Sequence, residues 1–210
     1  MLVVVGFAAE AALLPTDVPR LIAAADPMRL AVALAAMPRP SAILSLGIAG
    51  GLDPALRPGD LVVARDVVAE ARWRADEAWS AAIAEACGAL RADIAGTDRV
   101  IASARAKATL RAATGAVAVD MESAAVARLG VPFAVLRAIA DTADEALPAA
   151  AAVGLDAAGN PAPWRVMHAL LRRPQDLPGL IRLAWRSRTA LAALAPHCSA
   201  GAEAFHPPFG

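Results

Sequence analysis

Short apolar segments that alternate with alanine-rich stretches constrain the fold of this chain more than any other feature of its sequence. The apolar segments are rich in Val, Ile and Leu and end near Gly, Pro or Asp, which is typical of strands buried on both faces of a sheet. We predict strands at 2–6, 41–46, 60–70, 97–103, 116–121 and 131–141, and helices at 8–14, 76–90, 103–113 and 121–130. This alternation indicates an α/β protein with helices on both faces of a mainly parallel sheet.

The C-terminal part of the chain differs from the rest in its charge. Two more helices are predicted there, at 161–173 and 179–195, within what we expect to be a single domain, 1–210. From residue 161 onward six arginines stand against two acids, a net charge of +4 in a chain whose formal net charge is zero. The basic, amphipathic segment 161–195 suits an anionic lipid surface or a very apolar substrate, and equally two core-packing helices with a solvated arginine face. It contains no recognisable nucleic-acid-binding motif.

Several classes of protein are not indicated. No apolar run reaches the roughly 18–20 residues that cross a bilayer. The N-terminal apolar run has no basic region before it, unlike a signal peptide, so we expect a cytoplasmic protein. Cys87 and Cys198 are far apart, and the histidines share no metal-ligand spacing, so we expect reduced structural thiols and no metal site.

A glycine-rich segment, LGIAGGLDP at 46–54, follows the second predicted strand. It matches neither GxGxxG nor a Walker A loop, so phosphate binding by those mechanisms is not indicated. We expect a glycine turn over Gly47, Ile48, Ala49 and Gly50. Two interpretations stay open: a tight turn that needs positive φ, or a place where a ligand approaches the backbone closely.

Carboxylates lie at the ends of two predicted elements. Asp141 ends the strand 131–141, and ligands of open α/β sheets bind at the carboxyl ends of strands. A carboxyl group shielded from water there has a raised pKa and can act as a general acid. Glu122 begins a predicted helix that ends at Gly130, and the helix dipole stabilises a carboxylate at that position. Helix capping is the alternative for both acids and the expected role of Asp144.

Two long motifs carry a resemblance to a known family. LGIAGGLDPALRPGDLVVA at 46–64 and AVDMESAAVARLGVPFAVLRAIADTAD at 118–144 resemble the purine nucleoside phosphorylase and methylthioadenosine/S-adenosylhomocysteine (MTA/SAH) nucleosidase superfamily. The similarity extends from residue 1 to about 145. It implies a three-layer α/β/α sandwich with a mixed, mainly parallel, twisted central sheet. It also implies a homodimer without a metal or organic cofactor, and it leaves open whether inorganic phosphate is a co-substrate.

The resemblance also implies a reaction, cleavage of the N-glycosidic bond of a purine nucleoside, and roles for particular residues. Asp141 would protonate or hydrogen-bond N7 of the leaving purine, and Glu10 would activate the attacking water. Glu122 would accept the ribose hydroxyls, with Met121 packed on the sugar. The family lines the base at positions that match Val100 and Ile101.

Three positions depart from the family pattern. Ser45 and Ile48 stand where the phosphorylases hold phosphate with an Arg and a Ser, and the loss of that Arg favours water over phosphate unless another Arg replaces it. Ala140 stands where a Ser usually precedes the catalytic Asp, so the placement of the purine is expected to differ.

The C-terminal sequence PWRVMHALLRRPQDLPGLIRLAWRSRTALAAL, at 163–194, resembles a subfamily, the hopanoid-associated phosphorylases. This implies adenosylhopane as substrate, cleaved to adenine and ribosylhopane or its phosphate in hopanoid biosynthesis. An MTA/SAH nucleosidase is the alternative enzyme, and a nucleoside- or lipid-binding protein is the non-enzymatic one. The expected partners are a small purine nucleoside, with or without a lipid tail, and a second copy of the chain. Nucleic acid is not expected, and peripheral membrane contact through 161–195 is left open as one interpretation of that segment.

Overall fold

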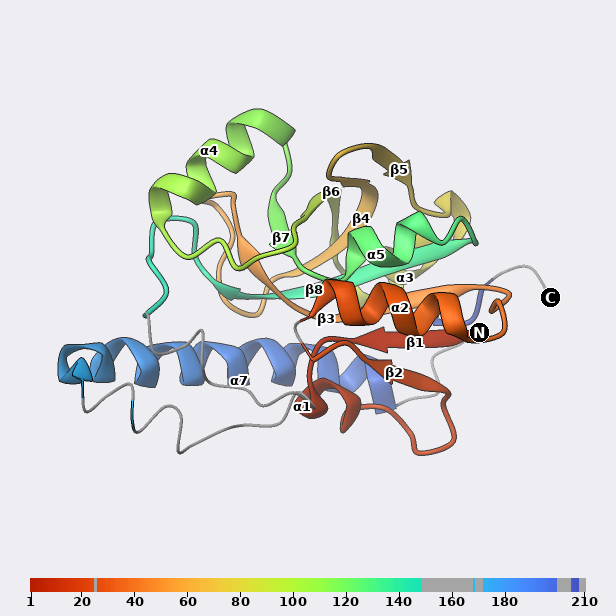
Figure 1. Cartoon of the computed structure of the whole chain (residues 1–210), viewed down its shortest axis with the longest axis horizontal. Helices are drawn as coiled ribbons and strands as arrows, with labels where there is room; N and C mark the ends of the chain where they lie inside the picture. The colour runs from red at the N-terminus through yellow and green to blue at the C-terminus, as the bar shows by residue number, and fades with distance from the viewer. Residues whose placement is uncertain (25, 149–167, 169–171, 200–204, 208–210) are drawn as a thin grey trace.

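The computed structural model describes all residues except 25, 149–167, 169–171, 200–204 and 208–210 (Figure 1). Its strands are β1 (Leu2–Val5), β2 (Arg20–Ile22), β3 (Ile43–Gly51), β4 (Leu61–Val68), β5 (Arg72–Arg74), β6 (Leu90–Gly96), β7 (Ala118–Asp120) and β8 (Phe133–Asp141). Its helices are α1 (Ala8–Ala11), α2 (Pro27–Ala36), α3 (Glu77–Cys87), α4 (Ala104–Thr114), α5 (Ser123–Arg128), the 3₁₀ turn η2 (Pro174–Asp176) and α7 (Leu177–Ser199).

The described strands form one mixed sheet in the order β2-β1-β3-β7-β6-β4-β5, with β8 paired to both β3 and β4. Through β8, the strands β3, β8, β4, β6 and β7 close into a ring of hydrogen-bonded neighbours. β1 pairs in parallel with β2 and β3, β3 pairs in parallel with β8, and β6 pairs in parallel with β4 and β7. The pairs β3–β7, β4–β5 and β4–β8 are antiparallel. The expected mixed, mainly parallel sheet is therefore confirmed.

Buried side chains of successive residues enter different cores on the two faces of the sheet. In β1, Val4 belongs to one core and its neighbours Val3 and Val5 to the other. The first core packs against α2 and α5, and the second against α3 and α7. Two apolar faces explain why the strand sequences are continuously hydrophobic rather than alternating. Helix layers on both sides of the sheet give the expected three-layer α/β/α arrangement.

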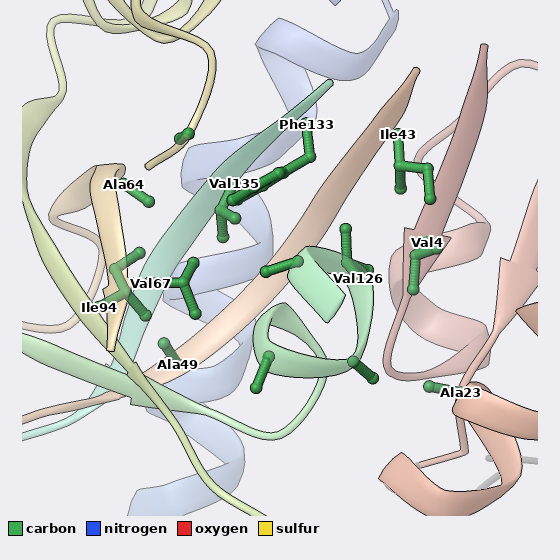
Figure 2. Close-up of a cluster of buried hydrophobic side chains, with 14 of the residues drawn as sticks. Val4, Ala23, Ile43, Ala49, Ala64, Val67, Ile94, Val126, Phe133 and Val135 are labelled. Atoms are coloured by element: carbon green, nitrogen blue, oxygen red, sulfur yellow. The ribbon is translucent and has the colours of Figure 1, made fainter. Parts of the chain in front are cut away.

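Figure 2 shows the first of these cores, with α5 in front of the strands. Val126 of α5 is fully buried and packs with Val4, Ile43 and Val135 from β1, β3 and β8. Gly130 follows α5 with φ 68°, the left-handed conformation expected of a glycine that ends a helix. The short helix α5 is therefore held against the sheet directly after β7, which fixes the segment 120–122 between them.

Several elements differ from the prediction. The strand expected at 97–103 is wrong, because these residues form no regular element and the strand is β6, which ends at Gly96. The predicted helix 76–90 ends at Cys87, because Gly88 has φ 61° and reverses the chain into β6. The elements β2, α2 and β5 were not expected. Charged residues interrupt β5 and β6, and the apolar pattern does not reveal such strands.

The glycine turn expected over 47–50 is also wrong. These residues continue β3 without interruption to Gly51, and none of the glycines in this stretch has a positive φ. The strand carries a register shift between Ala49 and Gly50 in its pairing with β8. Glycine serves here because other side chains of the protein approach the strand closely. The close approach of a ligand to this backbone stays a prediction.

The C-terminal helix α7 runs along the molecule from Leu177 to Ser199 and packs on β3 and β8, which confirms and extends the helix expected at 179–195 (Figure 1). The helix expected at 161–173 lies almost entirely outside the described residues. None of the helices that the structure describes is long and apolar enough to cross a membrane.

Candidate active site

Glu10 is a buried carboxylate held by backbone amides at the carboxyl end of β1. Its Oε2 accepts hydrogen bonds from the amides of Gly6 (2.6 Å) and Phe7 (3.0 Å), and its Oε1 accepts one from the amide of Ile48 (2.8 Å). Burial raises the pKa of the Glu10 carboxyl, although these amides and Arg137 favour the charged form. A carboxylate has room for about four donors. One acceptor position on Oε1 is therefore left for a further donor such as a water molecule.

Position 47 of β3 must be a glycine because the carboxylate of Glu10 lies against its backbone. A Cβ added at Gly47 would lie 2.6 Å from Oε1 of Glu10 and 2.8 Å from its Oε2. Any other residue would push the carboxylate away from the amides that hold it. The glycine-rich sequence is thus a place where a buried carboxylate of the protein itself approaches the backbone.

Glu122 lies beside Glu10. A Cβ on Gly6 would be 3.0 Å from Oε1 of Glu122 and 3.3 Å from Oε2 of Glu10, so both carboxylates converge on the same backbone position. Burial, with some repulsion from Asp120 and Glu10, raises the pKa of Glu122 to about 8 against the opposing attraction of Arg137. Two neighbouring carboxyl groups whose environments differ are a recurrent feature of acid–base sites.

Arg137 of β8 connects these acids and was not singled out from the sequence. Its Nε donates to Oδ2 of Asp120 (2.6 Å), and its Nη2 donates to Oγ of Ser45 (2.7 Å) and approaches Oε2 of Glu122 at 3.5 Å. The Arg137 side chain is only 1% exposed. Asp120 is held in turn, because its Oδ1 accepts hydrogen bonds from the amide and hydroxyl of Ser123 (3.0 and 2.6 Å). The Asp120–Arg137 pair therefore anchors the cluster.

Asp141 lies at the carboxyl end of β8, where its register partner is Gly50 of β3. It is 8% exposed, and a Cβ on Gly50 would come within 3.3 Å of its Oδ2. Lys107 of α4 donates to Oδ1 of Asp141 and is itself buried. Burial raises the pKa of Asp141 even though the ammonium of Lys107 opposes that shift. At roughly 3.3 Å per residue, Asp141 follows Arg137 along β8 by about 13 Å.

The other predicted site residues surround these acids less closely. Met121 connects Asp120 to Glu122 and is half-buried, and Ile48 contributes its amide to Glu10. Ile101 packs on a small core under α4, whereas Val100 is 48% exposed. The structure places Val100 and Ile101 in the loop between β6 and α4, and their place at the base stays a prediction.

A cavity of about 260 Å³ opens beside Asp141. It lies between the segment 141–148 that follows β8 and the first half of α7. Its charged lining consists of Asp141, Asp144, Glu145, Arg182 and Arg186. Arg186 forms an ion pair with Glu145 across it. Within the described part of the chain no group of three or more His, Cys, Asp or Glu side chains is arranged to hold a metal ion.

Most of the chain matches the model of a known protein family. Residues 22–160, about two thirds of the chain, match the model described as "Phosphorylase superfamily". The chain belongs to the phosphorylase superfamily. The expected superfamily and enzyme class are thereby confirmed at this level, while the hopanoid-associated subfamily stays a prediction.

Solved structures share the fold of this phosphorylase-superfamily chain at low sequence identity. Futalosine hydrolase of Helicobacter pylori is 18% identical with a TM-score of 0.63, over 92% of this chain and 94% of its own. MTA/SAH nucleosidase of Neisseria meningitidis, solved in complex with methylthio-immucillin-A, is 20% identical with a TM-score of 0.65, over 92% and 94%. The Helicobacter pylori MTA/SAH nucleosidase, solved with butyl-thio-DADMe-Immucillin-A, is 18% identical with a TM-score of 0.63, over 93% and 95%.

Sequence reasoning missed Arg137, Asp120 and Lys107 as parts of this phosphorylase-superfamily site. A signal for Arg137 was present, since an arginine in the middle of the apolar strand FAVLRAIAD must be neutralised by buried acids. Asp120 lies two residues before Glu122, and the sequence alone gives it no role. Lys107 is the only lysine of the chain, but its helix gives no pattern that points to Asp141.

Proposed function

We propose that this protein releases adenine from an adenosine-type nucleoside by hydrolysing the N-glycosidic bond. The observation that carries the proposal is the convergence of the Glu10 and Glu122 carboxylates on Gly6, with Asp141 farther along the same sheet edge. The family and the neighbouring nucleosidase folds support the reaction class. A fold alone does not fix a function, so the argument depends on this arrangement of acids.

The proposed mechanism divides the work among three acids. The bond between C1′ and N9 breaks, its electrons move to the purine, and Asp141 delivers a proton to N7. Glu10 accepts a proton from water as the oxygen of that water bonds to C1′, through the acceptor position that its three amides leave open. Glu122 accepts hydrogen bonds from the ribose hydroxyls, with Met121 on the sugar. Val100 and Ile101 would line the base.

Water fits this site better than phosphate as the nucleophile. Phosphate binding requires a cation with free donors, such as a bidentate arginine. The arginine beside Ser45 is Arg137, whose donors are already directed at Asp120, Ser45 and the carbonyl of Leu136. Glu10 adds negative charge next to it in the ionised form that a general base needs, whereas Glu122, with a pKa of about 8, adds it only in part near neutral pH. A phosphate dianion would therefore face carboxylates and a guanidinium that Asp120 already neutralises.

An assay of adenine release tests the reaction. The purified protein is incubated with methylthioadenosine, S-adenosylhomocysteine and adenosine, with and without phosphate, and adenine and the sugar product are quantified. We expect free ribosyl product at a rate independent of phosphate; ribose-1-phosphate formation would show a phosphorylase instead. Asp141→Asn is expected to lose adenine release by orders of magnitude while remaining folded. Wild-type protein that binds these nucleosides without cleaving them would support the non-enzymatic alternative.

A second candidate substrate is adenosylhopane, and one feature of α7 favours it over a small 5′ group. Leu177, Ile181 and Trp185 are exposed at 47%, 51% and 68% and recur every four residues, so they form one apolar stripe. Exposed arginines, including Arg182 and Arg188, lie on the same helix. Such a surface is typical of helices that lie on anionic membranes. We propose a cytoplasmic enzyme that contacts the membrane through α7 to reach a lipid-linked nucleoside.

Two measurements separate these candidates. Turnover of methylthioadenosine is compared with that of an adenosine carrying a long 5′-alkyl chain; a strong preference for methylthioadenosine would assign the protein to the MTA/SAH nucleosidases. Sedimentation with phosphatidylglycerol vesicles, for wild type and Trp185→Ser, tests membrane contact. Light scattering tests the homodimer that the family resemblance implies, since a second copy could instead cover the stripe.

A further inference from the structure

Lys107 has an unusual environment for a lysine. It is the only lysine of the chain, it lies on α4, and it is 1% exposed. Its Nζ donates to Oδ1 of Asp141, to the carbonyl of Thr142 (2.6 Å) and to the carbonyl of Glu145 (3.2 Å). An ammonium has three donors, so all of them are used within the protein. A buried lysine whose donors are all satisfied in this way is not available to bind a substrate directly.

The contact with Lys107 leaves the two oxygens of Asp141 unequal. Both oxygens lie near Gly50 of β3, since a Cβ there would be 3.3 Å from Oδ2 and 3.4 Å from Oδ1. Only Oδ1 accepts from the ammonium, and Oδ2 accepts no hydrogen bond from the residues that the structure describes. The two oxygens of a carboxylate are chemically equivalent, and a half-turn about the Cβ–Cγ bond only exchanges them. Lys107 therefore fixes the orientation of the carboxyl group, with one oxygen at the ammonium and the other left to face the site.

The same ammonium holds the segment that follows β8. The carbonyls of Thr142 and Glu145 both accept from Nζ, and the amide of Leu147 donates to the carbonyl of Ala102 at 2.7 Å. Ala102 directly follows Val100 and Ile101, the residues expected to line the base. The Lys107 side chain thus holds Asp141 and, through the segment 142–147, also the loop that contains Ala102.

We propose that Lys107 is a positioning residue that orients Asp141 so that Oδ2 faces the leaving base. The proposal rests on the proposed function, because it assigns Lys107 its role through Asp141. Among the described residues, Asp141 is faced by Lys107 from α4, by Arg182 and Arg186 from α7, and by Asp144 and Glu145 from its own segment. Lys107 is the one whose ammonium bonds to the Asp141 carboxylate.

Lys107→Met tests the proposal because it keeps an unbranched stem and removes the ammonium. We expect kcat for adenine release to fall 10- to 100-fold with a smaller change in KM. We also expect the alkaline limb of the kcat profile to move to higher pH, because burial then raises the pKa of Asp141 with less opposition. Arg111→Met, which removes a half-exposed cation of α4 paired with Asp53, is the control and should change neither quantity. A folded Lys107→Met enzyme with wild-type kcat and pH profile would overturn the proposal.

A second measurement needs neither turnover nor a stable Lys107 variant. Protein labelled with ¹³C-lysine gives a single side-chain ¹³Cε signal, because the chain has one lysine. We expect this signal to shift in Asp141→Asn relative to wild type, and to show in wild type a step at the pH where Asp141 titrates. A signal that is the same in both proteins would refute the contact. If wild type releases no adenine from any adenosyl nucleoside, the proposed function fails, whereas this signal still reports on Lys107 and Asp141.

Discussion

Arg137 and Asp120 form a fully buried ion pair, with Nε and Oδ2 2.6 Å apart and both side chains 1% exposed. The pair comes from different elements, the middle of β8 and the end of β7. Breaking a buried pair by removing one charge leaves the other uncompensated in a medium of low dielectric, which costs far more than breaking a surface pair. Loss of either charge of the Asp120–Arg137 pair is therefore expected to destabilise the fold and to remove support from Glu122.

Asp120→Asn is expected to lower the free energy of unfolding by about 3–5 kcal/mol, because Arg137 loses its closest counter-charge. The matched control is Glu70→Gln, which makes the same acid-to-amide change in the exposed Arg128–Glu70 pair. That change should cost no more than about 1 kcal/mol. Urea unfolding of both variants checks the prediction, and equal losses would mean that Arg137 is compensated by other groups.

The fold was predictable to the extent that its strands are buried on both faces. The sequence of β1 is continuously apolar, and those of β3 and β8 are mostly so, with Ser45 in β3 and with Arg137 and the terminal Asp141 in β8. Such runs identify central strands without any tertiary information. In β6, by contrast, Arg91 and Asp93 interrupt the pattern. Asp93 bonds to Arg65 and Arg72 from other strands, so the charges are explained only once the sheet has formed.

The site was predictable only in part, because some of its residues have partners that are distant in sequence. Glu122 and Asp141 stand out as carboxylates beside apolar elements, and the family resemblance added Glu10; their catalytic roles stay predictions. Arg137 and Lys107 acquire their meaning from partners that are distant in sequence. The glycines of β3 were misread as a turn because the sequence does not show that Glu10 approaches Gly47.

Glu10→Gln is expected to reduce kcat by about 10²- to 10⁴-fold, the usual contribution of a positioned general base. Because both oxygens of Glu10 accept hydrogen bonds from amides, a glutamine must also turn its NH₂ group toward a donor. We therefore expect an additional loss of about 1–3 kcal/mol in stability. Glu85→Gln, on the exposed side of α3, is the control for both assays. A Glu10→Gln enzyme with wild-type kcat would remove Glu10 from the mechanism.

The raised pKa of Glu122 predicts how stability depends on pH. Its pKa is about 8 in the folded protein and near 4.5 for an unperturbed glutamate, so the folded state binds more protons between these values. Stability from this group is fully present below pH 4.5 and is lost as the pH rises toward 8. Glu10 acts in the same direction, since burial raises its pKa as well. Glu122→Gln should flatten the decline between pH 4.5 and 8 in urea titrations; an unchanged slope would place the proton uptake elsewhere.

Gly47→Ala is predicted to damage activity more than stability. The new Cβ would lie 2.6 Å from Oε1 of Glu10, closer than real contacts allow, so the carboxylate must move off the amide of Ile48. A displacement of about 1 Å at a catalytic group can lower the rate by about 10²-fold. Gly115→Ala is a control that should affect stability and not activity. Gly115 has a φ of 73°, which strains an alanine, and no atom lies within 4 Å of the new Cβ. It should lower stability by roughly 1 kcal/mol and leave kcat unchanged. Measuring kcat and urea unfolding for both variants separates the two effects, and a Gly47→Ala enzyme with full activity would show that Glu10 need not stay where β3 now holds it.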